Sequence, residues 1–550
     1  MPNSREQLVE IQKDLLEDLK ARIYDTYGRR DAEMDRYYRD YQAEFRQGYQ
    51  RHASQAELAG TLVRADIAYF GDYHTFRPAQ SSVLRLLEKA AVERGRKVVL
   101  ALECLHAAHK HYARDMIDLK LEESEFLEAV RWDHTWGFSW ASFSRFFKFA
   151  RDHRAPLFGI NINADDRRED LKYRDEFAGY LIAALSLLYP ECLVAVVYGD
   201  LHLARGHIPA AVDRHLARFG ATRKSVRIYQ NSETIYWRLA ESRLENVVDA
   251  VKVDRDVYCI MEATPLVKFQ SFANWQHHRA ELVFGDDLTV EGAVHEQVVE
   301  LIGTICDFLG LAPPDVGKFE LYTPADLDLL ERLVERGLYT RDEMEALRAY
   351  VEMADSAYFT RAGILYVGNF SVSNAAEAAA RFILAEYGTN EEEAVESKDE
   401  FYGRVIVEAL AYFCTKIIDP RRKPSTEVEF ADVDRRSARK RKLATGLSRD
   451  LKIARAWLKH RQYERRMSTG EGTPAPSSLY RLPTDVHIGV TRALGRSLGE
   501  RMFNGMASEQ LDKAVVREAM IEDPFAPGVS RKRYFDLVKL LGEDGRGDRI

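Results

Sequence analysis

The sequence has few cysteines and no long apolar run, and both absences limit the class of protein. Its 550 residues include five cysteines, which are far apart and form no Cys-x-x-Cys pair. Three of them, Cys104, Cys192 and Cys259, lie in apolar runs, which indicates buried free thiols rather than a disulfide framework or a zinc knuckle. No apolar run reaches the roughly 18–20 residues of a membrane span, and Met1–Glu10 lacks the apolar region of a secretion signal. We therefore expect a cytoplasmic protein without a transmembrane segment.

The chain also lacks a strong charge of either sign. Its formal net charge is -8, which argues against wholesale binding to nucleic acid or to acidic membranes. A basic run, Arg435–Lys442, has no aromatic residues interleaved with it, and the acidic stretch Glu391–Glu396 balances it. The run is typical of a solvated helix face, so we expect no specific nucleic-acid partner.

Short apolar runs alternate with amphipathic stretches from residue 64 onward. The runs that predict buried strands are Ala65–Phe70, Lys97–Leu102, Pro156–Ile162, Leu193–Tyr198, Ser225–Gln230 and Val257–Met261. The stretches that predict helices between them are Ala79–Arg94, Ser139–His153 and Leu171–Tyr189. This alternation predicts an α/β domain with a mostly parallel sheet and flanking helices.

The rest of the chain is predominantly helical in its pattern. An aromatic stripe from Met34 to Phe45 predicts an N-terminal helix that packs on the main domain, with a partner-binding arm as the alternative. After about residue 285 the strand signal nearly disappears, and the short run Gly363–Val367 fits either a strand or a buried helix. The predicted organisation is an N-terminal helical arm (1–55), an α/β domain (56–285), a helical domain (286–467), a linker (468–478) and a C-terminal helical segment (479–550).

Two turns of the same local form carry the strongest chemical signal. One predicted strand runs into Gly71-Asp72-Tyr73-His74, and another runs into Gly199-Asp200-Leu201-His202. Glycine permits a sharp turn, and aspartate is able to orient an imidazole. Each histidine then lies beyond the carboxyl end of its strand, where open parallel sheets bind ligands. We therefore expect the two strands to be parallel, to be adjacent or separated by at most one strand, and to turn His74 and His202 toward one crevice.

Glu103 adds a carboxylate at the end of a third predicted strand. A charged group in an apolar run needs a partner or a ligand. With His74 and His202 it forms a His/His/Glu set, which suits zinc, manganese or iron. Without a metal, Glu103 suits the role of general base and the imidazoles suit acid or oxyanion stabilisation. The structural alternative is that Glu103 caps a helix or forms a salt bridge.

Several neighbouring side chains are candidates for contacts with a cofactor. Trp132–Trp140 is rich in aromatic residues and suits a pocket wall that stacks on a flat ligand, or alternatively a loop packed over the sheet edge. Arg205 and His207 follow the second turn at the start of a helix and suit an anion-binding corner. The full set of candidate cofactor-binding residues is Asp72, Tyr73, Trp132, His134, Asp200, Arg205 and His207.

Together these features resemble the ChaN haem-binding uptake proteins, which share a superfamily with the Tiki proteases, the TraB/GumN proteins and the erythromycin esterases. The resemblance covers roughly residues 60–285. It is carried by the two Gly-Asp-x-His turns, the strand that ends in Glu103, the Trp132–Trp140 segment and the stretch from Phe149 to Asn161. The N-terminal arm and the long helical C-terminal half depart from ChaN proteins.

The resemblance implies an α/β fold with its site at the strand ends, where His74, Glu103 and His202 match the shared residues. ChaN-like members bind haem, and Tiki-like members are regarded as metal-dependent hydrolases, so haem or a divalent iron, manganese or zinc ion is the expected cofactor. Erythromycin-esterase-like members hydrolyse esters with a histidine base and no metal. The alternatives are therefore a haem- or metal-binding protein, a hydrolase, and an inactive scaffold that binds a partner. The assembly state stays open, with a homodimer as one expectation.

Overall fold

A computed structural model describes residues 3–28, 30–162, 170–284, 290–324, 326, 329–354, 356–388, 398–440, 448–468 and 481–542. The chain forms two compact units. One consists of Leu19–Trp275, and the other consists of Met1–Asp18 together with Gln276–Ile550.

The Leu19–Trp275 unit is built on an eight-stranded sheet with the order β1-β7-β8-β6-β2-β5-β3-β4. In that order its strands are Arg51–His52, Ala250–Asp254, Val257–Ile260, Ser225–Gln230, Ile67–Asp72, Leu193–Gly199, Val98–His106 and Leu157–Asn161. Strand β7 pairs antiparallel with β1 and β8, and all other pairs are parallel. The mostly parallel sheet and its six predicted strands are confirmed, whereas β1 and β7 were not predicted.

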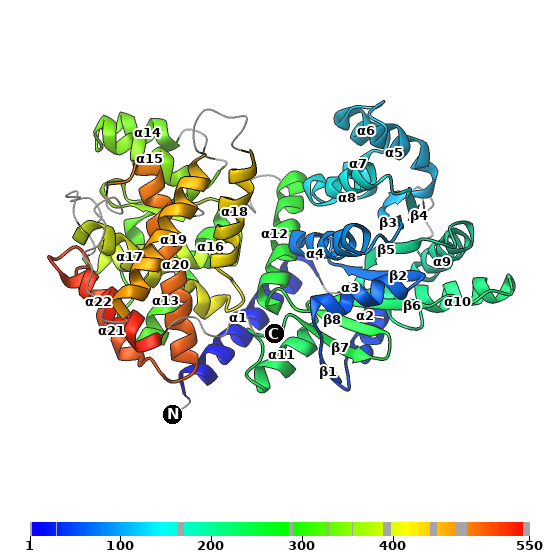
Figure 1. The fold of residues 1–550 in the computed structure, drawn as a ribbon, viewed down its shortest axis with the longest axis horizontal. Helices are drawn as coiled ribbons and strands as arrows, with labels where there is room; N and C mark the ends of the chain where they lie inside the picture. Colours follow the sequence, from blue (N-terminus) through cyan, green and yellow to red (C-terminus); the bar gives the residue numbers. More distant parts are fainter. Residues whose placement is uncertain are drawn as a thin grey trace. The chain divides into compact units, whose positions relative to one another are not determined.

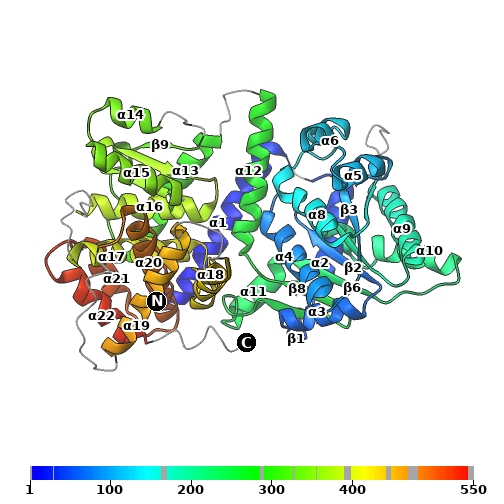
Figure 2. The same cartoon turned by 45° about the horizontal axis from the view of Figure 1, so that its top comes forward.

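Helices cover both faces of this sheet (Figure 1). Side chains alternate along each strand, so Ala68 and Phe70 of β2 pack against one helical layer while Ile67 and Tyr69 pack against the other. The first layer contains α3 (Gln55–Arg64), α4 (Arg77–Glu88), α5 (Lys110–Ile117), α6 (Glu123–Ala129), α7 (Trp132–Thr135) and α8 (Trp140–His153). The second contains α2 (Ala32–Glu44), α9 (Leu171–Leu188), α10 (Ile208–Arg218) and α11 (Glu233–Glu241), and α9 and α10 lie side by side in Figures 1 and 2.

The aromatic stripe of α2 is part of the second layer. Tyr41 lies in α2 and Phe45 directly follows it, and both pack edge-to-face on Tyr229 of β6, with ring centroids 5.7 and 5.1 Å apart. This confirms the prediction that the N-terminal helix packs on the main domain. The remaining helices at the ends of this unit are α1 (Ser4–Tyr27) and α12 (Pro265–Phe284), each of which continues into the other unit.

The Gln276–Ile550 part of the other unit is mainly helical. Its helices are α13 (Val290–Leu309), α14 (Leu329–Glu335), α15 (Arg341–Met353), α16 (Val372–Glu386), α17 (Lys398–Ile418), α18 (Glu427–Lys440), α19 (Arg449–Ser468), α20 (Thr484–Ala507), α21 (Lys513–Ile521) and α22 (Val529–Leu541). A three-stranded sheet, ordered β10 (Ser356–Phe359), β11 (Ile364–Val367), β9 (Glu320–Tyr322), accompanies them. The mostly helical character predicted for this half is confirmed; the Gly363–Val367 run is a strand, and the short strands β9 and β10 were not predicted.

Two glycines allow α20 to approach α17 closely. A Cβ on Gly495 would lie 2.8 Å from the carbonyl oxygen of Val405, and one on Gly499 would lie 2.5 Å from that of Ala409. Any larger residue would push the helices apart, since such distances are below contact. The close packing places Arg492 and the following turn of α20 directly against the interior of this unit.

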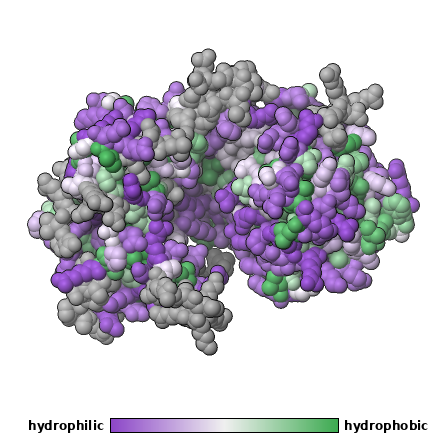
Figure 3. Space-filling model, turned by 90° about the horizontal axis from the view of Figure 1, so that it is seen from above, coloured by the Kyte–Doolittle hydropathy of each residue, from purple (hydrophilic) through white to green (hydrophobic). Residues whose placement is uncertain are grey.

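The surface and the cysteines agree with the composition. The face drawn in Figure 3 is predominantly hydrophilic, and its hydrophobic residues form small separate patches. Within the described ranges, no helix combines the length and the apolar character needed to cross a bilayer. All five cysteines are free, and Cys192 is the one that is not fully buried. The acidic stretch Glu391–Glu396, the end of the basic run at residues 441–442 and the predicted linker from residue 469 lie outside the described residues.

Candidate functional site

The two Gly-Asp-x-His turns end neighbouring parallel strands. Strands β2 and β5 pair in register from Ile67 opposite Val194 to Asp72 opposite Gly199. This confirms the prediction that the two strands are parallel and adjacent. Strand β3, which carries Glu103, is the other neighbour of β5. Three polar groups therefore leave the same edge of the sheet from consecutive strands.

The side chains of His74, Glu103 and His202 converge on Gly199. The point that a Cβ on Gly199 would occupy lies 3.4 Å from His74 Nε2, 3.5 Å from Glu103 Oε2 and 3.5 Å from His202 Cδ2. His74 Nε2 and Glu103 Oε2 are 3.6 Å apart. The structure thus brings together the three residues that the sequence singled out, and the missing side chain of Gly199 leaves room between them.

The first turn orients its own histidine. His74 Nδ1 and Asp72 Oδ2 are 2.8 Å apart, and Gln80 Nε2 donates to the other oxygen of Asp72. This contact makes Nδ1 the protonated nitrogen and leaves Nε2 as the nitrogen available to a ligand. Burial disfavours the charged imidazole, but the carboxylates of Glu103 and Asp72 outweigh it and raise the pKa of His74.

The histidine of the second turn is oriented by a carboxylate that lies outside that turn. His202 Nδ1 contacts Asp175 Oδ1 of α9 at 2.6 Å, whereas Asp200 of its own turn forms an ion pair with Lys268. Tyr37 of α2 donates its hydroxyl proton to the other oxygen of Asp175 at 2.8 Å. His207 lies 3.5 Å from that same oxygen and stacks on the Tyr37 ring at a centroid distance of 3.9 Å. The N-terminal arm therefore contributes directly to the orientation of His202.

A pocket adjoins the residues that orient His202, because Tyr37, Asp175 and His207 line it. It has a volume of about 370 Å³ and is lined by Arg36, Tyr37, Lys172, Asp175, Glu176, Gly206, His207 and Arg214. Burial lowers the pKa of His207, so its neutral form faces this pocket at neutral pH. His207 accordingly supports His202 through Asp175 rather than joining the three converging side chains. Arg205 is exposed, and its backbone N–H donates to Glu44.

Glu103 is held from two sides. Arg174 Nη2 donates to its Oε1 at 2.8 Å, and the backbone N–H of Gly199 donates to its Oε2 at 2.7 Å. Its side chain is 4% exposed, so this ion pair satisfies a charge that burial alone would disfavour. The structural alternative considered for Glu103, a salt bridge, is therefore observed, alongside its proximity to His74.

An aromatic wall lies beside His74. The His74 ring lies 4.6 Å from the ring of Trp136 and 5.0 Å from that of Phe138, measured between centroids. Phe138 in turn stacks on Trp275 at 4.7 Å. Trp136 Nε1 is buried and has no hydrogen-bond partner among the described residues. The wall thus combines flat apolar surface with one hydrogen-bond donor that a ligand is able to satisfy.

Trp132 and His134 take other positions in the same segment. Trp132 is buried in the core behind the wall, and its Nε1 donates to the carbonyl oxygen of Phe138 at 2.8 Å. His134 is exposed. The sequence therefore located the segment but selected Trp132 and His134 where the structure places Trp136 and Phe138 against His74.

Asp200 and Tyr73 flank the site without facing the three converging side chains. A Cβ on Gly71 would collide with the Asp200 carboxylate, so only glycine permits this approach. Asp200 Oδ2 accepts a bond from Lys268 at 3.1 Å, and burial raises the pKa of Asp200. The Lys268 ammonium also lies 4.7 Å from the centre of the Tyr73 ring. Lys268, Arg174 and Asp175 had no signal in the sequence, because each is one polar residue among many on an amphipathic helix, whereas Tyr37 belongs to the aromatic stripe that was predicted to pack on the main domain.

The arrangement suits a ligand with a flat apolar body and a group for an imidazole nitrogen to bind. Two imidazoles, each fixed through Nδ1 by a carboxylate, are also suited to general acid–base work. Over the described part of the chain, no group of three or more His, Cys, Asp or Glu side chains has the geometry of a metal site.

Comparison with known proteins places this site in a family context. The family model described as haem-binding uptake, Tiki superfamily, ChaN matches residues 58–169. A solved structure described as "Cofacial heme binding to ChaN of Campylobacter jejuni" is 14% identical, covers 38% of this chain and 92% of its own, and has a TM-score of 0.26. No curated protein matches the chain. The matched residues include His74, Glu103, Trp136 and Phe138, whereas His202 and Trp275 lie beyond them. The resemblance of the chain to the ChaN-like haem-binding uptake family of the Tiki superfamily is therefore confirmed over residues 58–169.

Proposed function

We propose that the α/β unit binds haem at the carboxyl ends of β2, β5 and β3. The observation that carries the proposal is the environment of His74. Asp72 fixes its Nδ1, two aromatic rings lie against its ring, and its Nε2 faces the space beside Gly199. A neutral imidazole nitrogen next to flat apolar surface is a common setting for haem iron.

The residues present fit such a cofactor. Haem, when bound, would supply an iron that an imidazole nitrogen is able to ligate. His74 would hold it, Trp136 and Phe138 would pack on its plane, and the unpaired Nε1 of Trp136 would donate to one of its polar groups. Glu103 and His202 lie close enough to act on the same ligand, and Arg174 keeps Glu103 in place.

The test is a haem titration followed by absorbance. The wild-type protein is expected to give a Soret band at saturating haem. His74→Ala should lower the affinity at least tenfold, because it removes the nitrogen that faces the ligand. His111→Ala is the matched control, since His111 is an exposed histidine of the same unit with no contact to the site. A His74→Ala protein with the wild-type spectrum and affinity would refute the proposal.

A second candidate is hydrolysis at the same position, with a divalent ion or a water molecule held by His74, Glu103 and His202. It is supported by the convergence of the three side chains on one point. The charge of Arg174 weighs against the ion, because Glu103 already neutralises that guanidinium. Elemental analysis of the purified protein, together with a model-ester assay, separates this candidate from haem binding, since a hydrolase turns over the ester without a Soret band.

One further proposal concerns the cellular compartment of the protein. All five cysteines are free, which supports a reducing compartment such as the cytoplasm. The homodimer and the absence of a specific nucleic-acid partner stay predictions.

A further inference from the structure

One face of helix α12 contacts all three segments of the candidate site. Lys268, Ser271 and Trp275 follow one another at steps of three and four residues, so their side chains lie on the same side of the helix. All three belong to the Leu19–Trp275 unit. Their partners are the second Gly-Asp-x-His turn, the residue that follows the first turn, and the aromatic wall.

The first turn of α12 is fixed to the strand ends. Thr264 is fully buried, and its Oγ1 accepts from the backbone N–H of Val267 at 3.2 Å. The Lys268 ammonium donates to Asp200 Oδ2 and to the carbonyl oxygen of Gln230, at 3.1 Å each. A charge-assisted bond to a buried carboxylate is a strong constraint. The start of the helix therefore has a defined position relative to the second turn and to the end of β6.

The next turn of α12 contacts the chain beside His74. The Ser271 hydroxyl donates to the carbonyl oxygen of Lys268 at 2.7 Å, which uses its only proton. In the 2.9 Å contact between Ser271 Oγ and Thr75 Oγ1, the donor is therefore the Thr75 hydroxyl. Because Thr75 directly follows His74, this bond ties the helix to the backbone that carries the imidazole.

Trp275 holds the turn that carries the aromatic wall. Its Nε1 donates to the carbonyl oxygen of Gly137 at 3.0 Å, and its ring stacks on Phe138 at an interplanar angle of 22°. Gly137 has φ 70°, a left-handed conformation that favours glycine. Trp132 of α7 donates to the carbonyl oxygen of Phe138, the next residue of the turn. Two indole N–H groups from two different helices thus fix two successive carbonyl groups of this turn.

Phe138 transmits the position of Trp275 to the imidazole. Its ring centroid lies 4.7 Å from that of Trp275 and 5.0 Å from that of His74. Trp136 contacts both Phe138 and His74, with centroids 5.2 and 4.6 Å apart. Packed aromatic rings of this kind leave little room for independent movement. A shift of the Trp275 ring would therefore move Phe138 and change the surface that lies against His74.

We infer that Trp275 is a positioning residue for the proposed haem site, since it holds Gly137 and Phe138 so that the aromatic wall lies against His74. Lys268 and Ser271 hold the helix that carries it. This role rests on the proposed function for its effect on haem, but the orientation of the wall is measurable without any ligand. Tryptophan suits the position because it combines a broad stacking surface with one hydrogen-bond donor.

Nuclear magnetic resonance of the ligand-free protein, labelled with ¹³C at the histidine Cε1, measures the orientation of the wall. The His74 resonance is assigned by its loss in His74→Ala, and the ring currents of Trp136 and Phe138 displace it. Trp275→Leu removes both the stacking ring and the donor, so it should move this resonance. Trp275→Phe keeps a ring and removes the donor alone, so it should move the resonance less. A tryptophan with a purely structural role would alter the melting temperature and leave the His74 resonance in place.

Haem titration of the same variants measures the effect on the ligand. Trp275→Leu should lower haem affinity about tenfold, and Trp275→Phe should recover part of the loss. Trp237→Leu is the matched control, because Trp237 of α11 is also partly buried and its Nε1 donates to Glu233. It should keep the wild-type resonance of His74 and the wild-type affinity.

The two readouts separate this role from the proposed function. A wild-type protein without a Soret band would refute haem binding, and the His74 resonance of the ligand-free variants would still decide the role of Trp275. A wild-type His74 resonance in both Trp275→Leu and Trp275→Phe would overturn that role. An equal displacement of the resonance in Trp237→Leu and Trp275→Leu would overturn it as well.

Discussion

Gly199→Ala is a change that tests the geometry of the haem site with a single methyl group. The added Cβ would lie 3.4–3.5 Å from His74 Nε2, Glu103 Oε2 and His202 Cδ2, which are ordinary van der Waals distances. The backbone at Gly199 has φ −52° and ψ 134°, a conformation that alanine adopts without strain. The fold should therefore accept the methyl group, while the space between the three side chains is filled.

The two effects have opposite signs and are measured separately. A glycine-to-alanine change at a compatible position stabilises a protein by about 0.4–1 kcal/mol, because the unfolded chain loses freedom. For a unit of this size the melting temperature would rise by about 1–4 °C. Haem affinity should fall at least tenfold, which corresponds to about 1.4 kcal/mol of binding free energy.

Gly71→Ala is the matched comparison at the other turn. Its Cβ would collide with the Asp200 carboxylate, whose Cγ would be 3.0 Å away, so Asp200 must move. Overpacking of this kind costs about 1–3 kcal/mol of folding free energy. Thermal unfolding followed by circular dichroism, combined with haem titration of both variants, gives the result. Wild-type haem affinity in Gly199→Ala, at an unchanged or raised melting temperature, would refute the placement of the ligand between the three side chains.

The remaining predictions concern the groups that orient the two imidazoles. The pKa of His74 is raised above 6.5, so its protonation stabilises the fold fully below that pH and the gain is lost as pH rises through the folded-state pKa. Ligation needs the neutral ring, so haem affinity should fall on acidification with a midpoint above pH 6.5. Asp72→Asn should shift this midpoint to lower pH. Haem titrations over a pH series measure it, and a wild-type midpoint below pH 6.5 would contradict the prediction. The double change of His74 and His202 to alanine should lower haem affinity little more than either single change, and an additive loss in a double-mutant cycle would show that the two act independently. Tyr37→Phe removes the hydrogen bond to Asp175 and should lower the free energy of unfolding, measured with urea, by about 0.5–1.5 kcal/mol. It should also lower haem affinity, by less than His202→Ala does. No change in either quantity would show that the N-terminal arm does not support the site.

Local patterns were sufficient for six of the eight strands of the sheet and for the ends of its central strands. The runs around Ile67, Val98 and Leu193 are apolar on both faces, because helices cover both faces of the sheet, and this made β2, β3 and β5 recognisable. The glycine and aspartate that end β2 and β5 then marked the site. Strands β9 and β10 have three and four residues, which is too short to show a periodic pattern of apolar residues. Nothing in the sequence therefore distinguished them from loops.

The supporting residues of the site depend on tertiary contacts that a sequence pattern does not carry. Asp175 lies 27 positions before His202 on a helix whose buried face also carries ordinary apolar residues. Trp136 and Trp132 are four positions apart, and only the turn after α7 decides which one meets His74.

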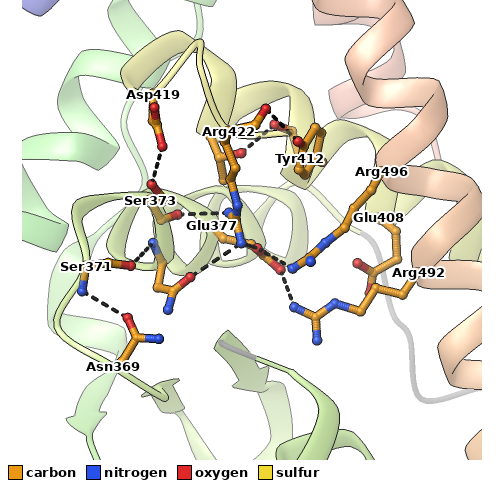
Figure 4. Close-up of polar contacts among 12 residues, drawn as sticks. Asn369, Ser371, Ser373, Glu377, Glu408, Tyr412, Asp419, Arg422, Arg492 and Arg496 are labelled. Carbon is orange, nitrogen blue, oxygen red and sulfur yellow. Dashed lines mark hydrogen bonds and ion pairs between the residues drawn. The ribbon is translucent and has the colours of Figure 1, made fainter. Parts of the chain in front are cut away.

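The charged cluster around Glu377 in the mainly helical unit was hidden for a related reason (Figure 4). Glu377 of α16 is 1% exposed, and its carboxylate contacts Arg422 at 2.9 Å and Arg492 and Arg496 at 3.2 Å each. Charges on a helix are expected at the surface, whereas these face one another in the interior.

The packing of α2 on β6 has a consequence for synthesis on the ribosome. Phe45 leaves the ribosome long before its partner Tyr229, to which it packs in the finished unit. At about 5–20 residues per second, elongation keeps the two apart for about 10–40 s. During this interval the sheet on which α2 packs is incomplete. The nascent chain therefore exposes the aromatic face of this amphipathic helix to solvent. The order in which the unit is made therefore favours protection of α2 by a chaperone until the segment that ends β6 has emerged.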